Sequence, residues 1–154
     1  MNTIVALLLL VIALGQAEQP LPFSHKTHVE LGLECQVCHA MPEPGDAATI
    51  PATATCMGCH DSVKTESAAI QQLAQAHERA QPIPWKRVYR VPDFVAFSHK
   101  THVTQGAVAC EICHGQVREL DVMRKLKETS MASCVECHTE KGAPNTCTTC
   151  HDPM

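Results

Sequence analysis

Cys35-Gln36-Val37-Cys38-His39 decides how this chain folds, because the same pattern recurs four more times along the sequence. The other copies begin at Cys56, Cys110, Cys134 and Cys147, and the five copies use all ten cysteines. Cys-x-x-Cys-His is the attachment pattern of c-type haem, in which two cysteine sulfurs hold the porphyrin and the next histidine binds the iron. On a helical turn the two cysteines lie on one face, so both sulfurs reach one porphyrin edge. The sequence therefore predicts five covalently bound haems c.

Paired cysteines have two other common uses, tetrahedral zinc sites and disulfide bonds. Neither use requires a histidine directly after every pair, and chance would produce that arrangement on the order of once in a million sequences of this composition. Cysteines separated by two residues are also poor long-range cross-links. Haem is favoured over both alternatives.

Each predicted site takes its covalent bonds and one iron ligand from its own motif. The attachment residues are Cys35, Cys38, Cys56, Cys59, Cys110, Cys113, Cys134, Cys137, Cys147 and Cys150. The proximal iron ligands are His39, His60, His114, His138 and His151.

Five histidines remain outside the motifs, one for each predicted iron. These candidate distal ligands are His25, His28, His77, His99 and His102. Two imidazoles on every iron would leave no open coordination position, which favours electron transfer over the binding of small molecules, so no catalytic residue is predicted. Thioether ligation is the alternative for a given haem, and the candidates are Met41, Met57, Met123, Met131 and Met154.

An internal duplication places four of these distal histidines. Phe23-Ser24-His25-Lys26-Thr27-His28-Val29 recurs unchanged at residues 97–103, and an attachment motif follows each copy. The two histidines of a copy are three residues apart, so on a helical turn they can reach two adjacent haems. We predict a di-haem module at 18–82, a hinge at 83–96 and a tri-haem module at 97–154.

Residues 1–17 have the features of a signal peptide. Ile4 to Leu14 is an unbroken apolar run, and Gly15-Gln16-Ala17 fits a cleavage site before Glu18. An uncleaved membrane anchor is the alternative, although spanning a bilayer takes about 20 apolar residues. We expect the mature protein to lie in the periplasm or elsewhere outside the cytoplasm, without inserting into the membrane.

The fold class predicted is that of a multihaem cytochrome c, with a few short helices and loops wrapped around five haems and little or no sheet. The longest helix is predicted over 61–80 and a second over 117–129, with only turns from Ser133 onward. Aromatic residues make up 3% of the chain, so the haems would supply most of the core. The haem-free chain is expected to be largely unfolded.

The formal net charge is −4, and haem propionates would add further negative charge. An acidic surface disfavours nucleic acid as a partner and favours a redox protein with a basic docking patch.

The repeated heptapeptide with its following motif resembles the class III type multihaem cytochromes c, including small three-haem members. That resemblance implies that His25 ligates the Cys35/Cys38 haem, His99 the Cys110/Cys113 haem and His102 the Cys147/Cys150 haem. His28 is then expected at the Cys56/Cys59 haem and His77 at the Cys134/Cys137 haem.

Residues 83–95 are also similar to the pentahaem cytochrome subunit of alternative complex III and related quinone oxidoreductases. The expected function is electron relay to or from a respiratory quinone-linked membrane complex, rather than enzymatic activity of the chain itself. The alternatives are a multihaem reductase with one open haem, and a subunit of an extracellular haem filament.

Overall fold

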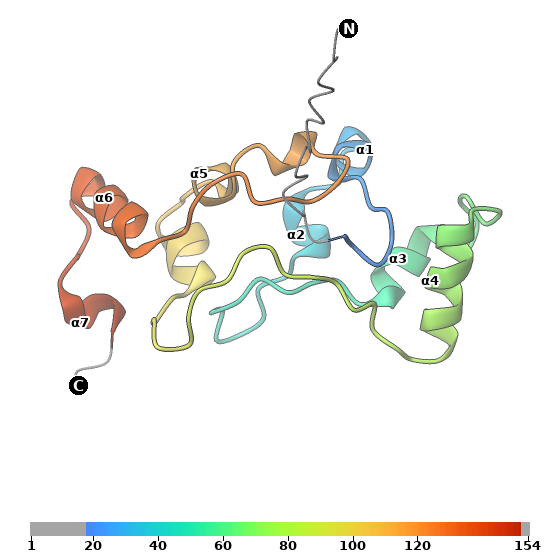
Figure 1. Ribbon diagram of the computed structural model, residues 1–154, viewed down its shortest axis with the longest axis horizontal. Helices are drawn as coiled ribbons and strands as arrows, with labels where there is room; N and C mark the ends of the chain where they lie inside the picture. Colours follow the sequence, from blue (N-terminus) through green and yellow to red (C-terminus); the bar gives the residue numbers. More distant parts are fainter. Residues whose placement is uncertain (1–17, 152–154) are drawn as a thin grey trace, which may run out of the picture.

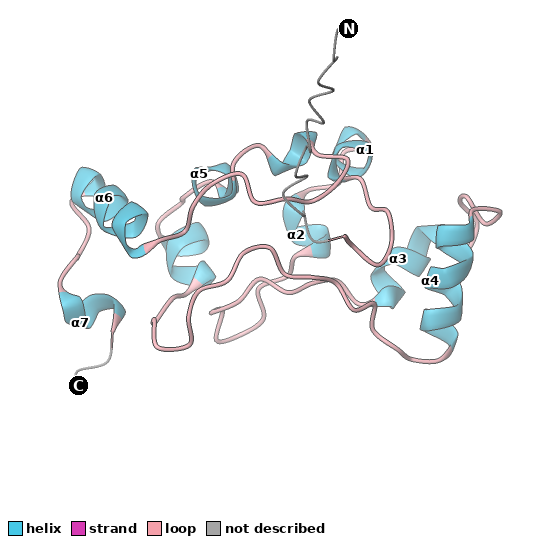
Figure 2. Ribbon diagram, in the orientation of Figure 1, coloured by secondary structure: helices cyan, strands magenta, loops and turns pink. Residues whose placement is uncertain are grey.

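The computed structural model describes residues 18–151 of the chain. The predicted signal peptide and Met154 therefore lie outside the described residues. The molecule is elongated, and its two ends carry different helices (Figure 1). Within residues 18–151 it consists of short helices joined by long loops, without a strand (Figure 2). This confirms the predicted fold class of short helices and loops.

The described helices follow one another along the chain with little regular structure between them. They are α1 (His25–Glu30), α2 (Cys35–Cys38), α3 (Thr53–His60), α4 (Ala68–Glu78), the π-helix η1 (Lys100–Gln105), α5 (Cys110–His114), the 3₁₀ helix η2 (Val117–Glu119), α6 (Met131–Lys141) and α7 (Cys147–Cys150). Both cysteines of each attachment motif lie on one of these helices, which is the local geometry that a shared porphyrin edge requires.

Three of the predicted helix boundaries are wrong. The helix predicted over 61–80 begins only at Ala68, because Lys64 takes a left-handed conformation (φ 56°) and extended Ser67 precedes the helix. The second predicted helix is reduced to η2, and most of the chain that follows it is irregular up to Ser130. Conversely, α6 continues to Lys141 where only turns were expected, held by a capping box between Ser130 and Ser133.

Apolar burial is sparse. Among residues 18–151 the buried hydrophobic side chains are those of Leu21, Leu73 and Leu120. A chain of this size normally needs a larger apolar core or a cofactor that replaces it. The polypeptide alone therefore supplies little of the hydrophobic stabilisation that a stable fold needs.

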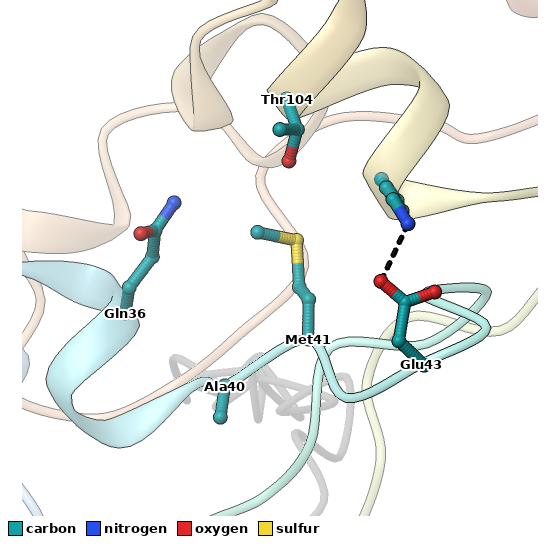
Figure 3. Close-up of a pocket in the computed structure, with 6 residues that line it drawn as sticks. Gln36, Ala40, Met41, Glu43 and Thr104 are labelled. Atoms are coloured by element: carbon teal, nitrogen blue, oxygen red, sulfur yellow. Dashed lines mark hydrogen bonds and ion pairs between the residues drawn. The ribbon is translucent and has the colours of Figure 1, made fainter.

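Segments that are distant in sequence are joined by hydrogen bonds. The Lys26 amide donates to the Leu120 carbonyl (3.1 Å), which fastens α1 to η2. The Lys100 ammonium pairs with Glu43 beside a pocket between α2 and η1 (Figure 3). Lys100 lies so close to Gly45 that a Cβ at Gly45 would collide with its side chain. Each heptapeptide therefore contacts a segment from the other half of the chain.

A search of the described helices for one that is both long and apolar enough to cross a membrane finds none.

Candidate haem sites

Four pairs of histidines face one another at nearly equal spacing. The ring centroids are 6.3 Å apart for His25 and His39, 6.2 Å for His28 and His60, 6.4 Å for His99 and His114, and 5.9 Å for His102 and His138. Each pair joins one motif histidine to one histidine from a repeated heptapeptide. The interplanar angles range from 2° to 64°, so the spacing is kept while the relative rotation of the rings varies.

This spacing fits a single iron between two imidazoles. A ring nitrogen binds such a metal at about 2 Å and lies roughly 1.1 Å from its ring centroid, which places two opposed centroids about 6.2 Å apart. The residues present therefore fit haem. Three of the pairs are those expected from the sequence, namely His25 with His39, His28 with His60 and His99 with His114.

Hydrogen bonds orient most of these rings through Nδ1. A backbone carbonyl accepts from Nδ1 in His28, His39, His60, His99, His102, His138 and His151. With its proton on Nδ1, an imidazole keeps the lone pair of Nε2 for the iron. The acceptors include Thr49, Asp46 and Pro144, which are loop residues that no sequence motif marks.

Burial favours the neutral imidazole at two of the sites. Burial lowers the pKa of His25, and the neighbouring His39 and His28 lower it further. The pKa of His114 is lowered in the same way by burial, then by His99 and His39. An uncharged ring is the form that binds a metal, so both environments suit ligation.

The attachment cysteines of different motifs are neighbours in a definite order, which begins at α3. Burial raises the pKa of Cys56, and the nearby Cys38 raises it further, so α3 and α2 carry adjacent sites. Burial and the nearby Cys35 likewise raise the pKa of Cys110, which makes α2 and α5 adjacent.

The same order continues toward the other end of the molecule. Burial raises the pKa of Cys113, with further contributions from Cys137 and Cys134 on α6. Burial raises the pKa of Cys134 most, and the nearby Cys150 on α7 raises it further. The sites therefore run α3, α2, α5, α6, α7, and the helices follow this sequence along the long axis in Figure 1.

His102 and His77 lie elsewhere than the sequence-based assignments implied. His102 faces His138 on α6, with 5.9 Å between the ring centroids, and not His151. His77 lies on α4, where its Nδ1 is 3.1 Å from the Thr53 hydroxyl. Since α4 packs on α3, at the far end of the molecule from α6, His77 does not face the Cys134/Cys137 site.

His151 is paired with an aromatic residue instead of a histidine. The Phe94 carbonyl accepts from its Nδ1 (3.2 Å), and the Phe94 ring lies 5.9 Å away at 26°.

Tyr89 is a contributor that the sequence analysis did not identify. Its hydroxyl donates to the His114 carbonyl (2.9 Å) and accepts from the Leu126 amide (2.8 Å), while its ring packs edge-on against the His114 imidazole at 4.5 Å. A lone tyrosine in an extended segment was the only signal, and it does not indicate a partner. Tyr89 thus fixes a motif histidine through contacts made only in the folded chain.

The geometry disfavours the zinc and disulfide alternatives. All ten cysteines are unpaired. Over residues 18–151, three or more His, Cys, Asp or Glu side chains nowhere converge as a metal ion would require. The cysteines are instead distributed in pairs along five separate helices.

Comparisons with known proteins agree with this description. Residues 11–83 match the class III cytochrome c family, and residues 95–152 match the family of cytochrome c7 and related cytochromes c. The chain is 32% identical to the multihaem cytochrome c subunit of the menaquinone reductase of Nitratidesulfovibrio vulgaris, an alignment that covers 89% of this chain and 78% of that protein.

Proposed function

Because this chain belongs to the multihaem cytochromes c of the class III type, we propose that it is an exported pentahaem protein relaying electrons to or from a quinone-linked membrane complex. It is an electron carrier, for which bound haem supplies the one-electron chemistry. The observation that carries the proposal is the set of four histidine pairs at 5.9–6.4 Å, since two imidazoles close an iron to other ligands.

The protein's own part is to hold each site in place and close to the next. Cysteines of neighbouring motifs lie near enough to raise one another's pKa, as Cys38 does for Cys56 and Cys150 for Cys134. Such adjacency supports five haems in one row, with ends at α3 and α7. The ten cysteines and five motif histidines named above are the proposed attachment residues and proximal ligands, and His25, His28, His99 and His102 are the proposed distal ligands.

The partner is proposed from the relative, which is a subunit of a menaquinone reductase. We expect the native chain to co-purify with membrane-integral subunits, and its haems to be reduced by menaquinol in that assembly but not in the isolated chain. Reduction of the isolated chain by menaquinol at the same rate would contradict a role within a complex.

Export is proposed from the apolar run at Ile4 to Leu14 and from haem attachment, which takes place outside the cytoplasm. Amino-terminal sequencing of the haem-loaded protein is expected to begin at Glu18. A start at Met1 would instead indicate a retained anchor.

Ligand substitution tests the proposed coordination. Mass spectrometry of the wild-type protein is expected to give five haems. His99→Ala is then expected to convert one low-spin haem to high-spin in electron paramagnetic resonance, without loss of a haem. Thr101→Ala is the matched control, because Thr101 belongs to the same heptapeptide as His99 but is exposed and carries no nitrogen or sulfur atom in its side chain to bind iron. An unchanged low-spin count in His99→Ala would refute the pairing of His99 with His114.

A further inference from the structure

The α7 end of the row differs from the other four sites in what faces its motif histidine. His151 has Phe94 beside it, with the phenyl ring 5.9 Å from the imidazole. A phenyl ring has no lone pair to give to iron, and Phe94 is 72% exposed. The Phe94 carbonyl accepts a hydrogen bond from Nδ1 of His151 and so orients the imidazole.

Most of the other imidazoles of the chain already face one another in pairs. The sequence has ten histidines, all within residues 18–151, and eight of them form the four pairs. Apart from His151 itself, only His77 remains. It lies on α4, hydrogen-bonded to Thr53, and Figure 1 shows α4 and α7 at opposite ends of the long axis.

The α7 site lies at one end of the row of attachment sites. The helix has four residues, and Cys147 is exposed. In the order of attachment sites α7 has a neighbour on one side only, at Cys134. Its backbone is anchored by the Ala96 amide, which donates to the Cys150 carbonyl (2.8 Å).

We propose that the haem attached at Cys147 and Cys150 has His151 as its one imidazole and an exchangeable sixth position, which takes one small lone-pair ligand such as carbon monoxide, cyanide or free imidazole. The inference rests on the proposed function. It adds that the row ends in a ligand-binding site at α7, while the four sites from α3 to α6 are closed by histidine pairs. The α7 end is then the place where a small molecule reaches iron.

Ligand stoichiometry in the haem-loaded, reduced protein tests the proposal. Carbon monoxide is expected to bind at one equivalent per five haems, and the ferric protein is expected to show one high-spin haem in five by resonance Raman and paramagnetic resonance. Cys147→Ala/Cys150→Ala is expected to yield a protein with four haems by mass that binds no carbon monoxide. Retained binding in that variant would place the open iron elsewhere and overturn the proposal.

His77→Ala is the control for the remaining histidine. It is expected to leave both the high-spin fraction and the carbon monoxide stoichiometry unchanged, and a rise in either would show that His77 closes a fifth iron. In the wild-type protein, no carbon monoxide binding or more than one equivalent would also overturn the proposal. So would a thioether-to-iron absorption band that disappears in Met154→Ala.

Failure of this inference is distinguishable from failure of the proposed function. Five low-spin haems with no ligand binding would overturn the open site and leave the electron relay intact. Fewer than five haems by mass in the wild-type protein would contradict the pentahaem proposal itself.

Discussion

The phenylalanine of each heptapeptide makes the same contacts with the two histidines of its own copy. Phe23 stacks on the His28 imidazole at 4.5 Å and meets His25 edge-on at 4.9 Å. In the second copy, Phe97 stacks on His102 at 4.7 Å and meets His99 edge-on at 4.8 Å. Each phenylalanine thus packs on both imidazoles of its own segment. The repeat is therefore a unit that orients the two imidazoles proposed as distal ligands.

The serine of each copy holds the first turn, but with different partners. The Ser24 hydroxyl accepts from the Thr27 amide (3.0 Å) and donates to Asp121 (2.8 Å). The Ser98 hydroxyl accepts from the Thr101 amide at 3.2 Å, and its contact with the Gly45 carbonyl is 3.4 Å. Ser24 thus has the shorter bonds and a charged partner from a distant segment.

Ser24→Ala is expected to lower the free energy of unfolding by about 1 kcal/mol, the usual cost of losing a helix cap. Ser98→Ala is expected to cost less, because its hydrogen bonds are longer and its partner is uncharged. Chemical denaturation of the two haem-loaded variants measures the difference. A larger loss in Ser98→Ala would contradict the ranking.

At the scale of the helices, two attachment helices end in a glycine with positive φ. Gly115 follows α5 with φ 71° and ψ −167°, a conformation that is essentially restricted to glycine. Gly142 follows α6 with φ 62° and ψ 26°, the left-handed region that other residues reach at moderate cost. A Cβ at Gly115 would lie 2.9 Å from Leu126 Cβ, whereas at Gly142 it would meet nothing within 4 Å.

Gly142→Ala is expected to destabilise the protein by about 1 kcal/mol. Gly115→Ala is expected to cost about 3 kcal/mol, since strain in the glycine-only region adds to the collision with Leu126. Because Gly115 follows His114 directly, only this variant is also expected to change the spectrum of the α5 haem. Thermal denaturation with visible absorption checks both effects, and equal destabilisation without a spectral change would contradict the argument.

The sequence predicted the helices only where no turn or tertiary hydrogen bond interrupts the apolar spacing. The apolar spacing of α4 was recognisable, but its late start depends on the left-handed turn at Lys64. Residues 117–129 have helical apolar spacing, yet Leu120 is buried beside α1 and the Leu126 amide is bonded to Tyr89. Tertiary hydrogen bonds there replace those of a helix. For α6, Ser130 and Gly142 were usable cap signals that the sequence analysis overlooked.

Over the whole molecule, the sequence predicted three of the four histidine pairs that face one another but not the fourth. Three histidine pairs follow the local order of repeat and motif, as with His25 and His39. His102 is different, because it faces His138 on α6 and not His151, the partner that the family resemblance implied. Counting histidines suggested five pairs, whereas the distance between α4 and α7 leaves His77 and His151 apart.

Because few apolar side chains are buried, we expect the stability of the fold to depend on the proposed row of haems. With Leu21, Leu73 and Leu120 as the buried hydrophobic residues of the described chain, folding free energy must come largely from the bound cofactors. In the proposed row, a haem in the middle has two neighbours and a haem at the end has one. Loss of a central site should therefore unfold more of the chain than loss of a terminal site.

Two matched double variants test this dependence on position. Cys35→Ala/Cys38→Ala removes the site on α2, whose cysteines neighbour both Cys56 and Cys110, and is expected to abolish amide protection in α1, α3 and α5. Cys147→Ala/Cys150→Ala removes the terminal site and is expected to lower protection only in α7 and the adjoining part of α6. Hydrogen exchange read by mass spectrometry resolves these segments. Equal loss of protection in both variants would mean that the fold depends on the number of haems and not on their order.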